Sequence, residues 1–130
     1  MKKSVFFISI FLNSVLSFSA NAETVLYCQE ELATGLIKDK SAWKTGNFIK
    51  ERYTIKFNND YSRLEGLGRR GMVCRTTYSK NIVSCADFSG DTFLYNRNYM
   101  RFALARMSIE GYVNAGEDSD NLSIGTCKDF

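Results

Sequence analysis

The chain has 130 residues, of which 45% are hydrophobic and 24% charged, with 17 basic and 14 acidic side chains. It contains no histidine, which excludes the usual general base, the Ser–His and Cys–His nucleophile pairs and the commonest metal ligand. It also contains no proline, which excludes proline-rich recognition segments.

The first 22 residues have the layout of a secretory signal peptide. Lys2 and Lys3 form a positive n-region, a mostly apolar stretch follows from Val5 to Phe18, and residues 20–22 (Ala-Asn-Ala) form a cleavage site of the A-x-A type. The apolar stretch is shorter than the about 20 residues that a spanning helix needs. We therefore expect cleavage after Ala22, a periplasmic or secreted location and no stable membrane insertion.

Cleavage there would leave one domain, residues 23–130, which is a normal size for a single domain. Because the leader removes two lysines and no acidic residue, the net charge falls from +3 to +1. A nearly neutral domain has no overall attraction to polyanions, so we expect no nucleic-acid partner. All seven tyrosines remain, and aromatic residues favour strands and fill small cores.

The first half of the domain is predicted to consist of strands. Residues 52–58 give the clearest signal, because Tyr53, Ile55 and Phe57 alternate with polar residues at the period of a half-buried strand. Turn clusters at 39–41 and 58–60 separate the neighbouring segments. The other predicted strand segments here are 25–28, 35–37 and 61–67. Residues 28–33 suit either a helix or a strand.

The four cysteines predict two disulfides, because an even number in an exported domain indicates a paired framework. Cys74 and Cys85 lie at equal distances from the centre of a predicted hairpin between Ser79 and Lys80, so they face each other across its strands. That pairing leaves Cys28 with Cys127. With no C-x-x-C pair and no histidine, we expect no zinc site.

In the second half, residues 92–95, 99–106 and 122–127 are predicted strands, and residues 111–113 precede a polar turn at 114–121. The segment 100–107 also consists of good helix formers, so a helix is the alternative there. Short segments punctuated by turns favour a mainly β fold. We expect a small antiparallel sandwich or barrel of about seven or eight strands, with one short helix on the sheet as a variant.

Two motifs resemble ligand sites but depart from the required pattern. Residues 66–71 satisfy G-x-G-x-x-G, yet the segment after them is strand-like rather than helical, so we interpret them as a loop between strands. Residues 117–121 resemble the start of a calcium loop, but Leu122 occupies the third ligand position. We therefore expect neither a nucleotide cofactor nor a bound metal.

A basic segment is the candidate binding site. Arg69, Arg70 and Arg75 lie within seven residues of one another, and guanidinium groups bind carboxylates and phosphates well. The functional interpretation is a site for an acidic protein, a glycan or a phosphate. The alternative is a solvated loop without a ligand.

The leading hypothesis is a small, exported, non-catalytic binding or inhibitor-like module. Small periplasmic inhibitors of lysozymes or proteases share this general build, which is an analogy of architecture without a shared motif. A second hypothesis is a hydrolase that uses carboxylates. Its candidate residues are Glu51, Glu65, Asp87, Asp91 and Glu110. A third is an envelope structural protein, which an exposed apolar patch would favour. No oligomeric state is predicted.

Overall fold

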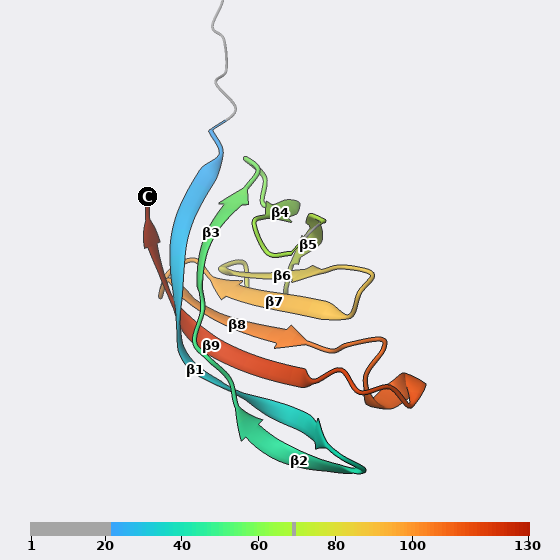
Figure 1. Cartoon of the computed structure of the whole chain (residues 1–130). Helices are drawn as coiled ribbons and strands as arrows, with labels where there is room; N and C mark the ends of the chain where they lie inside the picture. Colours follow the sequence, from blue (N-terminus) through green and yellow to red (C-terminus); the bar gives the residue numbers. More distant parts are fainter. Residues whose placement is uncertain (1–21, 69) are drawn as a thin grey trace, which may run out of the picture.

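The computed structural model describes residues 22–68 and 70–130, and within them nine strands and one 3-10 turn form the fold (Figure 1). The elements are β1 (Thr24–Asp39), β2 (Ala42–Asn47), β3 (Arg52–Phe57), β4 (Arg63–Glu65), β5 (Met72–Thr76), β6 (Ile82–Ala86), β7 (Asp91–Asn96), β8 (Arg101–Arg106), the 3-10 turn η1 (Tyr112–Asn114) and β9 (Asp120–Asp129).

The strands form a closed antiparallel barrel. β1 pairs with β3, each strand from β3 to β8 pairs with its successor, and β9 pairs back with β1. Eight strands therefore make the wall, and β2 is an extra strand that pairs with the second half of β1. Figure 1 shows this β1–β2 hairpin extending beyond the barrel. The predicted mainly β fold is confirmed, and it is a barrel.

β1 is the longest strand, with 16 residues, and it connects the barrel to the hairpin. Its residues 24–29 pair with β3, and its residues 34–39 pair with β2. The register with β9 shifts between Glu30 and Leu32, which marks a β-bulge. A bulge bends a strand and increases its twist, so one strand can serve two different partners. The predicted separate segments 25–28 and 35–37 thus belong to one continuous strand, and residues 28–33 are strand.

The core lies inside the barrel and is rich in aromatic rings. Tyr53, Ile55 and Phe57 of β3 are buried, as their alternating pattern predicts. The ring of Phe57 stacks on Tyr95 at a centroid distance of 5.6 Å, and that of Phe93 stacks on Phe102 at 5.3 Å. Side chains fill the interior of a barrel with eight strands, and here they are large and flat.

Both predicted disulfides are present. Cys74 pairs with Cys85 across the β5–β6 hairpin, and the two residues are direct partners in the strand register. Cys28 pairs with Cys127 across β1 and β9, which are the two strands whose pairing closes the barrel. All four side chains belong to the buried core. Two disulfides indicate an oxidising environment outside the cytoplasm.

Several predicted elements differ from those observed. Residues 101–106 form β8 and not the alternative helix, because β7 and β9 pair with both edges and Phe102 and Leu104 alternate into the core. Tertiary pairing here overrides helix propensity. The segment predicted at 61–67 is strand only over β4, and residues 112–114 form the 3-10 turn. The glycine-rich segment 66–71 joins β4 to β5, as expected for a loop between strands.

The predicted signal peptide, apart from Ala22, lies outside the described residues. Among the residues that are described, no helix is long and apolar enough to cross a membrane.

Removing the disulfide between β1 and β9 should destabilise the protein more than removing the hairpin disulfide. The two bonds join residues 99 and 11 positions apart. In the chain-entropy model, such loops contribute about 4.7 and about 3 kcal/mol respectively. Chemical denaturation of the Cys28→Ala/Cys127→Ala and Cys74→Ala/Cys85→Ala variants measures both losses. Equal losses, or a larger loss for the hairpin pair, would contradict this expectation.

Candidate functional site

One end of the barrel carries the loops that form the candidate site, and we call this end the mouth. Because the strands alternate in direction, every second connection opens there. These connections are residues 48–51 before β3, 66–71 after β4, 87–90 after β6 and 107–119 after β8. The opposite end carries the β3–β4, β5–β6 and β7–β8 turns. The first strand, β1, begins there and the last strand, β9, ends there.

The β6–β7 turn presents Phe88 to solvent, with 95% of the residue exposed. The turn is held by its own hydrogen bonds. The Asp87 carboxylate accepts from the backbone N–H groups of Ser89 at 2.9 Å and Asp91 at 3.0 Å, and Asp87 N–H donates to the Asp91 carbonyl at 3.1 Å. Such a network is typical of an aspartate-initiated turn. The exposed ring is therefore carried by an ordered turn.

Gly90 fixes this turn against the end of β8. It adopts a φ of +100°, and a Cβ atom there would lie 2.2 Å from the Met107 carbonyl oxygen. Only glycine combines this backbone conformation with so close an approach. The sequence Phe-Ser-Gly-Asp at 88–91 thus favours one geometry of the turn.

Phe88 lines two hollows on the outside of the barrel, and the smaller one extends along β5 and β6 as far as Thr77. The larger has a volume of about 830 Å³ and is lined by Arg63 and Arg70. The smaller has a volume of about 510 Å³ and is lined by Arg75. Both hollows also contact Phe88 and Val73. Each hollow thus combines the Phe88 ring with at least one arginine.

Two of the three arginines in the predicted basic site lie at these hollows. Arg70 lines the larger one and Arg75 the smaller one, and each therefore shares a hollow with Phe88. Arg69 lies outside the described residues. That these arginines bind a ligand stays a prediction. Phe88 was not singled out in the sequence, although an aromatic residue inside the turn cluster Asp-Phe-Ser-Gly is a signal that could have identified it.

A buried polar network supports the mouth from inside the barrel. Glu30 is only 2% exposed, and its carboxylate accepts from the Tyr53 hydroxyl at 2.5 Å and from the Glu51 backbone N–H at 2.8 Å. Arg106 Nη2 donates to the Tyr53 hydroxyl oxygen at 3.1 Å and to the Glu51 carboxylate at 3.2 Å. The guanidinium also lies over the Tyr53 ring, 5.4 Å from its centroid.

This network keeps the buried carboxylate ionised. Burial by itself disfavours the charged form of Glu30. The nearby Ser123 hydroxyl, the hydrogen bonds from Tyr53 and Glu51 N–H and the charge of Arg106 outweigh it and lower the pKa of this carboxyl. For Tyr53, burial and the bond to Glu30 both raise the pKa, so the phenol stays protonated and donates. The network therefore holds Arg106 in place at the mouth.

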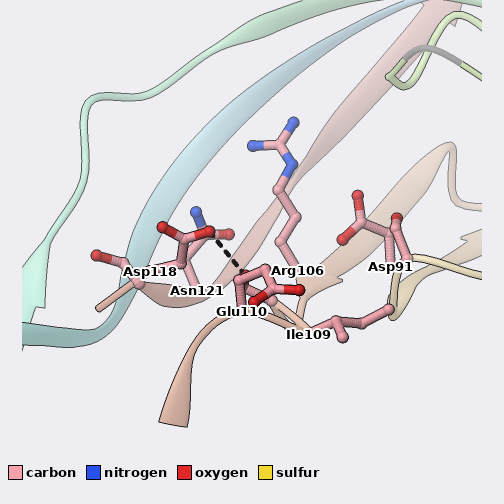
Figure 2. Close-up of a pocket in the computed structure, with 9 residues that line it drawn as sticks. Asp91, Arg106, Ile109, Glu110, Asp118 and Asn121 are labelled. Atoms are coloured by element: carbon pink, nitrogen blue, oxygen red, sulfur yellow. Dashed lines mark hydrogen bonds between the residues drawn. The ribbon is translucent and has the colours of Figure 1, made fainter. Parts of the chain in front are cut away.

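A third hollow, of about 560 Å³, is lined by Arg106 together with the carboxylates of Asp91, Glu110 and Asp118. Figure 2 shows Arg106 rising between Asp91 on one side and Asp118 and Asn121 on the other. Burial, followed by the negative charge of Asp87, raises the pKa of Asp91, and the charge of Arg106 opposes this. Asp118 is held by a hydrogen bond from the Ser108 hydroxyl at 3.1 Å.

The structure separates the five candidate carboxylates into groups. Asp91 and Glu110 line the third hollow, and Asp87 lines the adjoining one. Glu51 pairs with Arg106, and Glu65 pairs with Lys56 on the exterior of the barrel. The acidic turn before β9 lies partly in the third hollow, through Asp118. Among the described residues, no group of three or more possible ligands is arranged to hold a metal ion.

Comparison with known proteins adds no relative. The chain matches no protein-family model, no curated protein and no solved structure. The class that the molecule itself defines is a small disulfide-bonded barrel of eight antiparallel strands with a charged and aromatic mouth.

Replacing Glu30 with Gln should change how stability depends on pH. A carboxyl with a lowered pKa in the folded state stabilises the protein above its unfolded pKa, near 4.5, and this stabilisation is lost as the pH falls through the folded pKa. Glu30→Gln should therefore be less stable than the wild type at pH 7, and the difference should shrink as the pH falls below about 4.5. Denaturation curves over a pH series measure this.

Glu65→Gln is the matched control, because its carboxylate lies on the barrel exterior in a surface ion pair, and such pairs contribute little. A constant difference between Glu30→Gln and wild type across the pH series would contradict the role assigned to the network.

Proposed function

We infer that the protein is a small exported, non-catalytic binding module, inhibitor-like in its build, that docks onto another protein through the Phe88 turn. The observation that carries this proposal is the 95% exposure of Phe88 on a turn held by its own hydrogen bonds. The two disulfides support a location outside the cytoplasm, in the periplasm or the medium.

The shape of the site favours a protein partner over a small molecule. Small-molecule sites are concave and enclose their ligand, whereas Phe88 projects from the surface. Aromatic and arginine side chains are enriched at protein interfaces and at their hot spots. A turn that is ordered before binding loses little conformational freedom on docking, which favours affinity. A projecting, rigid aromatic tip can enter a cleft of the partner, as an inhibitor would.

The charge of the site favours an acidic partner surface. Arg63 and Arg70 share one hollow with Phe88 and Arg75 shares the other, and none of the three takes part in an ion pair within the described part of the chain. The carboxylate of Asp87, which lies beside them, is already engaged by the turn. We therefore propose that the partner offers an apolar pocket for the phenyl ring, bordered by carboxylates. A phosphate ligand would use the arginines without needing the ring.

Phe88→Ala should weaken binding to the partner by about 30-fold or more, because a central aromatic hot spot contributes about 2 kcal/mol or more. The partner is first isolated by affinity capture from native periplasm or culture medium, and its affinity for each variant is then measured by calorimetry. Arg70→Ala/Arg75→Ala should also weaken binding and reduce its dependence on salt.

Tyr78→Ala is the matched control, because Tyr78 is a fully exposed aromatic residue on the β5–β6 turn at the opposite end of the barrel. Binding that Phe88→Ala leaves unchanged, or a wild-type protein that captures nothing, would overturn the proposal. Loss of binding in the arginine variant alone would favour the phosphate ligand.

A second candidate function, hydrolysis by carboxylates, is favoured by one observation. Asp91, whose pKa is raised, lines a hollow together with Glu110 and Asp118. Glycosidases use two carboxyl groups, one of which is kept protonated. If this function is correct, the protein hydrolyses at least one of a panel of chromogenic glycosides, and Asp91→Asn abolishes the activity. Asp60→Asn, at the β3–β4 turn on the opposite end, should leave it unchanged. The absence of turnover on the whole panel would remove this candidate.

A further inference from the structure

The outside of the barrel wall carries an apolar surface that is separate from the mouth. The strand register aligns Leu94, Ala103, Ile124 and Leu32 in one row across β7, β8, β9 and β1. A neighbouring row consists of Thr92, Ala105, Leu122 and Thr34. We call these eight residues the outer face.

The four large apolar side chains of the outer face are neighbours, and all of them are exposed to solvent. Leu32 is 55% exposed, Leu94 42%, Leu122 50% and Ile124 45%. Single exposed apolar residues are common, but a contiguous patch indicates an interaction surface. The outer face is such a patch, because its members are register partners on adjacent strands.

The outer face has a shape that is complementary to itself. Ala103 and Ala105 give β8 a row of small side chains, which we call the groove. Leu122 and Ile124 form a ridge along β9, directly beside that groove. A second copy turned about an axis between β8 and β9, parallel to the strands, would place its ridge in the groove. The same rotation would place its Leu32 opposite Leu94.

The charges at the border of this face are also complementary. Arg101 is the register partner of Thr126, and the Glu31 carboxylate accepts a hydrogen bond from the Thr126 hydroxyl at 3.2 Å. Both charged residues are exposed and lie at the same end of the face. Neither belongs to an ion pair in the portion of the chain that the structure covers. The rotation described above would bring Arg101 of one copy next to Glu31 of the other, twice.

We propose that the outer face binds a second copy of this chain and that the protein is a symmetric dimer. An interface of this kind uses the same patch on both subunits and closes, so it forms dimers and not fibres. The dimer would cover the ridge and the groove of both copies. Because the axis runs along the strands, the two mouths would open on the same side. The proposal is independent of the proposed function, since Phe88 lies outside the outer face.

Sedimentation velocity over a concentration series, with the protein expressed from the full chain, tests this proposal. The wild type should sediment as a dimer. Ile124→Glu places a charge in the centre of the face and should raise the dimer dissociation constant at least about tenfold. Val73→Glu is the matched control, because Val73 is an exposed strand residue, at 59%, outside the outer face. It should leave the dimer unchanged.

Charge reversal tests the symmetry without touching apolar residues. Arg101→Glu and Glu31→Arg should each raise the dissociation constant, and the double variant should restore it, since the double reversal re-forms the pair across the axis. A wild type that stays monomeric throughout the series would overturn the proposal. So would equal weakening by Val73→Glu and Ile124→Glu, or a double reversal without rescue.

Discussion

The pairing of the first strand with the last holds the barrel closed. β1 and β9 meet along almost the whole length of β9, and the disulfide between Cys28 and Cys127 joins them inside the core. The two cysteines lie 99 positions apart, so bringing them together from the unfolded chain costs conformational entropy. Every loop at the mouth takes its position from strands whose places follow from this closure. The β-bulge in β1 lets the same strand also carry the β1–β2 hairpin.

Because side chains fill the inside of the barrel, a ligand can contact only its surfaces. The stacked rings of Phe57, Tyr95, Phe93 and Phe102 occupy the inside of the barrel, as is usual for barrels of this size. Arg106 lies at the mouth and contacts both the buried polar network and a hollow on the surface. Its guanidinium is anchored by Glu51 and Tyr53 and also borders the hollow that contains Asp91. A change at the buried network would therefore alter the hollow that contains Asp91.

The sequence predicts the local parts of this structure well and the long-range parts less well. The alternation of Tyr53, Ile55 and Phe57 identifies β3, and the symmetric spacing of Cys74 and Cys85 identifies their pairing; both are local signals. Residues 101–106 are ambiguous in the sequence because only the pairing of β8 with β7 and β9 excludes a helix. The exposure of Phe88 and the rows of the outer face depend on turn packing and register, which the sequence does not display.

The first strand begins and the last strand ends at the same end of the barrel. Phe130 N–H donates to the Val25 carbonyl at 3.3 Å, and this contact lies at the end opposite the mouth, where Figure 1 shows the C-terminus beside the start of β1. A tether, a solid support or a fused carrier protein attached at either terminus would therefore hold the barrel in the same orientation. In each case the Phe88 turn would point away from the attachment point. This geometry would suit a protein that must present one end while it is anchored by the other.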